Sequence, residues 1–114
     1  MHEYSVVQAL MSQCADYLRQ HQAEQVEQIV VQIGVLSGVE PELFERAFDC
    51  FKLAEPWCQQ AELKLEVQPV RVHCADCGFE GETQPHDYRC PQCQSGEVKI
   101  IAGQDLLLMQ LTLR

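Results

Sequence analysis

The 114-residue chain has few positive charges and no long apolar run. Its 8 lysines and arginines stand against 17 aspartates and glutamates, which gives a formal net charge of −9. A surface of this sign repels phosphate backbones, so the composition argues against nucleic acid as a partner and favours metal ions or basic protein surfaces. No segment approaches the roughly 18 apolar residues of a membrane span, and the first residues lack the basic and apolar regions of a secretory signal. We therefore expect a cytoplasmic protein that does not bind membranes.

Common enzyme motifs are missing as well. The sequence has no Gly-x4-Gly-Lys loop to hold the phosphates of a nucleotide, and no pairing of a nucleophile with a base can be argued from it. Hydrophobic residues make up 46% of the chain and charged residues 22%, which is typical of a folded domain. The sequence therefore predicts a folded binding protein and not an enzyme.

Hydrophobic periodicity predicts two helices and three strands. Apolar residues at helical spacing predict a helix over about residues 4–21, and Pro41 and Pro56 bracket a second helix with an aromatic face. Period-two alternation predicts strands within residues 25–36, 62–70 and 105–114. The fold class that follows is α+β, with two helices packed on a three-stranded, mostly antiparallel sheet.

The same alternation predicts which residues of a strand share one face. These residues are Ile29, Val31, Ile33 and Val35 in the first strand, and Leu107, Met109, Leu111 and Leu113 in the last strand.

The segment between the second and third strands has a different composition. It holds four cysteines and few aliphatic residues, so it cannot bury enough apolar surface to fold unaided. Apolar alternation resumes only near residue 105, so the segment is predicted to be an insertion between two strands of one sheet. We therefore divide the chain into an α+β domain of residues 1–70 plus 104–114 and a zinc-ribbon domain of residues 71–103.

Four of the seven cysteines form a C-x2-C-x12-C-x2-C pattern, which is typical of a metal site in a reducing compartment. Two residues between cysteines let both thiolates reach one ion from a tight turn, and two such turns complete a tetrahedron. Four sulfurs leave no open coordination position, which favours a structural Zn(II) ion, although rubredoxin-type iron suits the same ligands. The predicted ligands are Cys74, Cys77, Cys90 and Cys93.

The remaining cysteines and two histidines have less definite roles. Cys14 and Cys50 lie on or near apolar helix faces, which favours small core residues. Cys58 has no assigned role. His73 and His86 flank the cysteine pairs, and we expect solvent-exposed histidines there, with ligation of a second ion as the alternative.

The chain opens with "MHEYS", which places a histidine at the second position. An exposed histidine at a frayed terminus is the simplest interpretation. The α-amine of Met1, the amide nitrogen of His2 and its imidazole can also close two fused chelate rings on one ion, with Glu3 next in reach. Nitrogen-rich planar sites of this kind select Ni(II) or Cu(II) over Zn(II), and their affinity falls as the ligands are protonated. Because histidine is large, we expect Met1 to be retained.

The order of these features resembles the HypA/HybF family of hydrogenase nickel-incorporation proteins. The resemblance covers the whole chain and rests on "MHEYS", the "LSGVEPELF" helix start, the cysteine insert and the final strand. It implies a nickel metallochaperone that works with a HypB-type GTPase and delivers Ni(II) to the large subunit of [NiFe]-hydrogenase. The implied nickel ligands are Met1, His2 and Glu3, with Glu40 as a further candidate, and the implied zinc ligands are the four paired cysteines.

Glu40 has a second interpretation, because it directly precedes Pro41 and would be the N-cap of the second helix. A glutamate there is atypical as a cap but is also favoured by the helix dipole. The main alternative for the chain is a zinc-ribbon adaptor that binds proteins or nucleic acid, and iron-based electron transfer is a third reading. The sequence leaves open whether the chain forms a homodimer.

Overall fold

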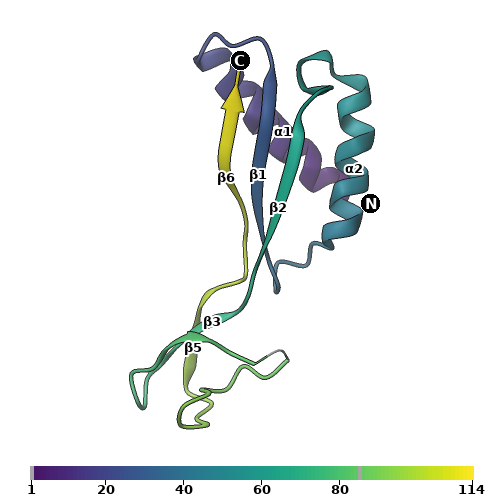
Figure 1. Cartoon of the computed structure of the whole chain (residues 1–114). Coiled ribbons are helices and arrows are strands. Elements are labelled where there is room, and N and C mark those ends of the chain that lie inside the picture. The colour runs from purple at the N-terminus through teal and green to yellow at the C-terminus, as the bar shows by residue number, and fades with distance from the viewer. Residues whose placement is uncertain (1, 85) are drawn as a thin grey trace.

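A computed structural model describes residues 2–84 and 86–114, with the backbone alone for His2. These residues form an elongated molecule, with extents of 52 × 28 × 17 Å, in which two three-stranded sheets follow one another along the long axis (Figure 1). The elements in chain order are α1 (His2–Gln20), β1 (Val26–Gly34), α2 (Pro41–Ala54), the short 3-10 helix η1 (Pro56–Cys58), β2 (Glu62–Gln68), β3 (Arg71–Cys74), β4 (Glu80–Glu82), β5 (Val98–Ala102) and β6 (Leu106–Leu113).

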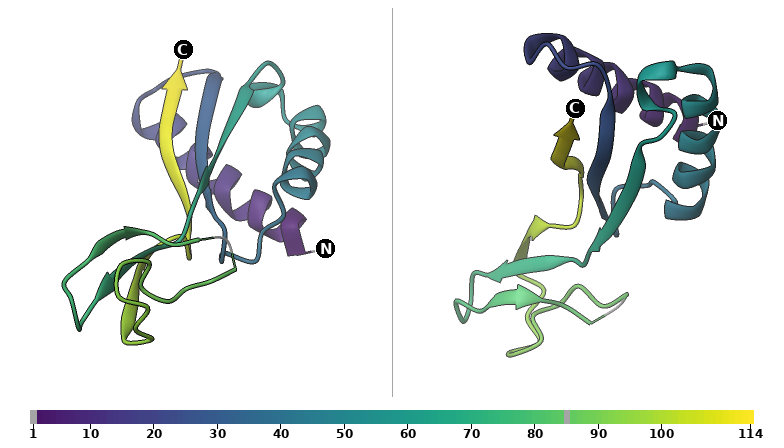
Figure 2. Two further views of the ribbon diagram at one scale, coloured as in Figure 1. Left: turned by 60° about the horizontal axis from the view of Figure 1, so that its bottom comes forward. Right: turned by 45° about the horizontal axis from the view of Figure 1, so that its top comes forward.

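The larger sheet has the order β2-β1-β6, and both helices pack on one of its faces (Figure 2). The core between them contains Phe44 and Phe48 from α2 and Met11 from α1, each at most 1% exposed. β1 is the central strand, and its run of β-branched residues, including Val30 on the opposite face, is buried. Its apolar run is limited to Ile29, Val30 and Val31, where the strand is buried on both faces.

The predicted α+β fold with mostly antiparallel sheets is confirmed. Among the described residues, the pairings β1–β6, β3–β4 and β3–β5 are antiparallel, and β1–β2 is parallel. The parallel pair follows from the connection, because β1 and β2 are joined through α2, and parallel neighbours need a crossover of this kind. α2 has the bounds that its two prolines predict, while α1 begins two residues before the predicted start.

The predicted inner face of the last strand is half wrong. Leu111 and Leu113 pack on the core, but Leu107 and Met109 are about half exposed, at 46% and 51%. The cause is a β-bulge, since Val30 pairs with Gln110 whereas the next residue, Val31, pairs with Leu108. Met109 is the extra residue, and an extra residue moves every side chain beyond it to the other face.

Val35 was also predicted to be on the inner face of its strand, and this prediction is wrong. β1 ends at Gly34, and Val35 is 52% exposed. The chain turns away at this point, where Leu36 donates a backbone hydrogen bond to Gly103 at 2.7 Å. The alternation in the sequence therefore continues beyond the strand itself.

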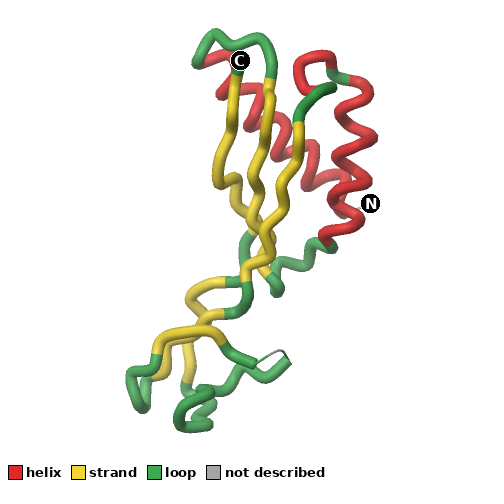
Figure 3. Tube along the Cα trace, viewed as in Figure 1, coloured by secondary structure: helices red, strands yellow, loops and turns green. Residues whose placement is uncertain are grey.

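The smaller sheet has the order β4-β3-β5 and lies at the far end of the molecule (Figure 3). The two connections to the larger sheet cross close to the end of β1. A Cβ on Gly34 would lie 2.3 Å from the carbonyl oxygen of Gly103, and a Cβ on Gly103 would lie 2.9 Å from the Cα of Val70. Glycine is therefore required at both positions by the close approach of the backbones.

Candidate metal centres

The four paired cysteines bring their sulfur atoms together at the end of the smaller sheet. The sulfurs of Cys74, Cys77, Cys90 and Cys93 all lie within 4.8 Å of one another. Two of the separations, Cys74 to Cys93 and Cys77 to Cys90, are 3.6 Å. A tetrahedral ion with metal–sulfur bonds of about 2.3 Å holds its sulfurs about 3.8 Å apart, so the arrangement fits Zn(II) or iron with little movement.

Two similar turns position these thiols. In each turn the backbone N–H four residues after the first cysteine bonds back to the carbonyl of that cysteine, from Gly78 to Cys74 at 3.0 Å and from Gln94 to Cys90 at 2.9 Å. Gly78 and Gln94 both have a positive φ, of 79° and 66°. The left-handed residue ends each turn and lets both thiols point to the same side.

A side-chain link between the two turns was not foreseen from the sequence. The Ser95 hydroxyl donates to the Asp76 carboxylate across the cluster, and the Glu97 backbone N–H donates to the same hydroxyl at 3.0 Å. No spacing in the sequence indicates this pair, because Asp76 lies between the cysteines of the first turn whereas Ser95 lies two residues after the last cysteine of the second.

Two thiols of the cluster, Cys90 and Cys93, have pKa values that are shifted in opposite directions. Burial opposes ionisation of Cys90, but the backbone N–H groups of Cys93 and Gln92 and the neighbouring thiols together lower its pKa to about 7. For Cys93, the Ser95 backbone favours the thiolate, but burial and the other three thiols raise the pKa to about 12. Adjacent thiolates repel one another, and a divalent cation in the centre removes this repulsion.

The N-terminal ligand candidates are only partly described. Met1 and the His2 side chain lie outside the described residues. Glu3 is described, and one of its carboxylate oxygens accepts a hydrogen bond of 3.5 Å from the Glu40 backbone N–H. Glu40 is the N-cap of α2, and its own side chain makes no capping hydrogen bond. The described fold thus places two of the predicted nickel ligands, Glu3 and Glu40, beside each other.

Of the other cysteines, two are buried and one is not. Burial raises the pKa of Cys14 to about 12, and burial together with the charge of Glu55 raises that of Cys58 to about 11. Cys50 is exposed, so its prediction as a core residue is wrong. It lies on α2 beside the covered face rather than within it, and helical spacing alone does not separate these two positions.

The two histidines near the cluster are exposed, as predicted, but only one is in a turn. His73 lies in β3 between Glu80 of β4 and Lys99 of β5, whereas His86 has a left-handed backbone with a φ of 63°. Within residues 3–84 and 86–114, the one group of three or more metal-ligating side chains is the four-cysteine cluster.

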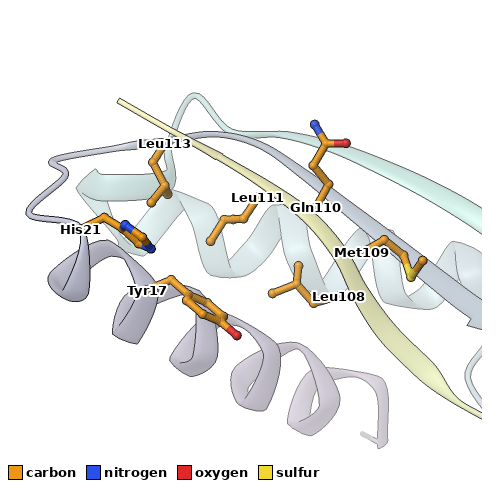
Figure 4. A pocket seen from close by; sticks show the side chains of 7 residues that line it. All are labelled: Tyr17, His21, Leu108, Met109, Gln110, Leu111 and Leu113. Atoms are coloured by element: carbon orange, nitrogen blue, oxygen red, sulfur yellow. The ribbon is translucent and has the colours of Figure 1, made fainter.

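A shallow apolar groove lies between α1 and the edge strand β6. Tyr17 of α1 and His21, directly after that helix, face Leu108, Leu111 and Leu113 of the strand across it (Figure 4). His21 is the one titratable imidazole in its lining, so the groove has no set of metal ligands. Within the described part of the chain, no helix is both long and apolar enough to cross a membrane.

These features define a metal-binding protein with a four-cysteine cluster on a small sheet attached to a larger α+β unit. A family model described as "Hydrogenase/urease nickel incorporation, metallochaperone, hypA" matches residues 1–113. The chain therefore belongs to the HypA family of nickel-incorporation metallochaperones. Since a metallochaperone carries a metal and catalyses no reaction, the chain is not an enzyme.

Individual relatives agree with this assignment over nearly their whole length. The hydrogenase maturation factors HypA of Shewanella halifaxensis and Aquifex aeolicus are 43% and 45% identical over 113 residues, which is 99% of this chain and 97% of each relative. The solution structure of the Ni metallochaperone HypA from Helicobacter pylori superposes with a TM-score of 0.71 at 33% identity, covering 97% of this chain and 96% of that one. A second HypA solution structure has a TM-score of 0.76 at 34% identity, covering 100% and 97%.

Proposed function

We propose that the chain binds Ni(II) at its N-terminus and delivers it for the maturation of [NiFe]-hydrogenase. The observation that carries this proposal is the match to a nickel-incorporation family over residues 1–113, which includes both the opening "MHEYS" and the cysteine insert. We place the protein in the cytoplasm, where its relatives' role as hydrogenase maturation factors would be exercised.

The proposed nickel ligands are the α-amine of Met1, the amide nitrogen and imidazole of His2, and Glu3. Deprotonated nitrogen donors in a plane favour Ni(II), while a terminal site that is open on one side allows a partner to take the ion. Glu40 is the candidate for an additional ligand, because its backbone N–H lies 3.5 Å from a Glu3 carboxylate oxygen. This contact keeps the start of α2 close to the N-terminus.

A Zn(II) ion held by Cys74, Cys77, Cys90 and Cys93 has a structural role in this proposal. The sulfur separations of 3.6 Å support it, because they nearly equal those of a tetrahedral zinc site. Binding of such an ion would stabilise the folded state of the cysteine module, residues 71–103. We treat this module as a domain distinct from residues 1–70 plus 104–114.

The partners we propose are a HypB-type GTPase and the large subunit of [NiFe]-hydrogenase. The chain has no phosphate-binding Gly-x4-Gly-Lys loop, so nucleotide hydrolysis during delivery would belong to the GTPase.

Calorimetric titration with Ni(II) tests the terminal site. We expect His2→Ala to weaken binding at least about tenfold, which corresponds to about 1.4 kcal/mol, because the variant loses one donor and a chelate ring. His21→Ala is the matched control, since this exposed histidine lies just after the other end of α1. Equal nickel affinity in both variants would remove the support for His2 as a ligand.

A further inference from the structure

A second surface on the larger unit shares only Glu3 with the proposed nickel site, and its other lining residues have no role in metal binding. We call it the α1–α2 groove, and it is lined by Glu3, Tyr4, Leu43, Arg46, Ala47 and Cys50. Its volume is about 470 Å³. It lies between the first turn of α1 and the exposed side of α2, next to the proposed nickel ligands.

Two leucines of α2 are exposed, Leu43 in the groove and Leu53 near the C-terminal end of the helix. Leu43 is 45% exposed and Leu53 is 76% exposed. The opposite face of the same helix buries Phe44 and Phe48 against the sheet. α2 therefore buries its main apolar face, while Leu43 and Leu53 are left uncovered by the described chain. A groove with a mainly apolar lining on the surface of a small protein is typical of an interaction site.

The charges around the α1–α2 groove are mainly negative. Glu3 and residues 40–53 together contribute five carboxylates and two basic side chains, which gives 2 − 5 = −3 for this surface. Three of the carboxylates, Glu42, Glu45 and Asp49, lie together on the exposed side of α2 beside the groove, with Arg46 among them and Lys52 4.0 Å from Asp49, and we call this surface the acidic ridge. An apolar groove flanked mainly by carboxylates is complementary to a helix with an apolar face and a basic flank.

We propose that the α1–α2 groove is the docking surface for a partner protein that presents a basic amphipathic helix. An apolar anchor of that helix enters between Tyr4 and Leu43, and its basic flank lies along the acidic ridge. Docking there places the partner within one helical turn of Glu3, beside the proposed nickel ligands. A second copy of this chain fits the surface poorly, because it carries the same net charge of −9 and would be repelled.

The proposal goes beyond the nickel site, and its test uses no nickel, so either can fail alone. The probe is a peptide made of two Leu-Lys-Lys-Leu-Leu-Lys-Leu repeats, titrated into the full-length zinc-loaded protein and followed by backbone amide NMR. The control probe has the same composition in an order that gives no apolar helix face. We expect one-to-one binding of the first peptide, shifts confined to α1 and α2, and an affinity about tenfold or more above that of the control peptide.

Leu43→Ser and Leu107→Ser form a matched pair of variants, because the two leucines are equally exposed, at 45% and 46%, and lie on different surfaces. We expect Leu43→Ser to weaken peptide binding about tenfold and Leu107→Ser to leave it unchanged, as for the loss of one interface anchor. Equal weakening in both variants would overturn the proposal. Equal affinity for the two peptides would also overturn it, since binding would then be electrostatic alone.

A measurement on the unmodified chain avoids any folding defect in the variants. Cys50 lines the groove and is exposed, so a docked helix should slow its alkylation at least about fivefold when the peptide is saturating. An unchanged alkylation rate at saturation, or concentration-dependent self-association that excludes the peptide, would place the partner elsewhere and overturn the proposal.

Discussion

At the residue scale, a site residue can be predicted from the sequence when its role depends on local spacing and not on long-range packing. The four cluster cysteines are predictable because two-residue spacing is a local property of a turn, and the described turns at Cys74 and Cys90 have this geometry. Burial of the other cysteines depends on packing between helices, so Cys14 was predicted correctly and Cys50 was not. The nickel ligands Met1 and His2 stay predictions that follow from chelate chemistry and family resemblance.

The three cysteines outside the cluster are expected to differ strongly in reactivity. In the native, zinc-loaded protein at pH 8, about half a unit below the usual thiol pKa, an alkylating reagent should modify Cys50 and leave Cys14 and Cys58 unmodified. Burial excludes the reagent from the latter two and raises their pKa values to about 12 and about 11. Peptide mass analysis after timed labelling measures this. Modification of Cys14 as fast as Cys50 would contradict the described packing, and labelling in denaturant provides the control in which all become reactive.

At the scale of elements, helices were easier to predict than the faces of strands. The prolines that begin and follow α2 act locally, so its bounds could be read from the sequence. The bulge at Met109 has no local signature, because Leu106 to Met109 are all apolar and their alternation does not show where the inner face changes register. The parallel pairing of β1 with β2 also could not be read from either strand, since it is a consequence of the connection through α2.

Deletion of Met109 tests the bulge directly. Without this residue, Val31 to Leu108 and Val30 to Gln110 become consecutive pairs in a regular ladder, and all other inner side chains keep their face. We expect the free energy of unfolding to change by less than about 1 kcal/mol, because no core contact is lost. Denaturant titration of the zinc-loaded protein measures the change.

Deletion of Leu111 is the matched control. It moves Thr112 toward the face that Leu111 occupies and removes a side chain packed on the core, so we expect a loss of about 2–5 kcal/mol. If the Met109 deletion costs as much as the Leu111 deletion, the assignment of the bulge is wrong.

At the scale of the whole molecule, the two sheets are joined where three backbone segments approach closely. The sequence predicts an insertion between the strands that became β2 and β6, but the contact of Gly34 with Gly103 depends on the path of both connections. Glycines at both positions were visible in the sequence without a reason for them. The described crossing supplies that reason.

Gly103→Ala is therefore expected to be more destabilising than Gly38→Ala. Both glycines have a positive φ, of 103° and 80°, so both variants incur the cost of about 1–2 kcal/mol for a side chain in this region. Only at Gly103 does the added Cβ also meet backbone, 2.9 Å from the Cα of Val70, whereas nothing lies within 4 Å of it at Gly38. Comparison of the unfolding free energies tests the difference, and equal costs would show that the crossing is looser than described.

The central claim for the whole molecule is that the nickel ligand is the terminus itself, with its backbone included. The most direct measurement is calorimetric Ni(II) titration of a form with one glycine added before Met1, beside a control with one glycine added after Arg114. The account predicts that the N-terminal addition lowers nickel affinity at least about tenfold although His2 is intact, because the α-amine is displaced from its chelate ring. Undiminished nickel affinity in the N-terminally extended form would contradict it.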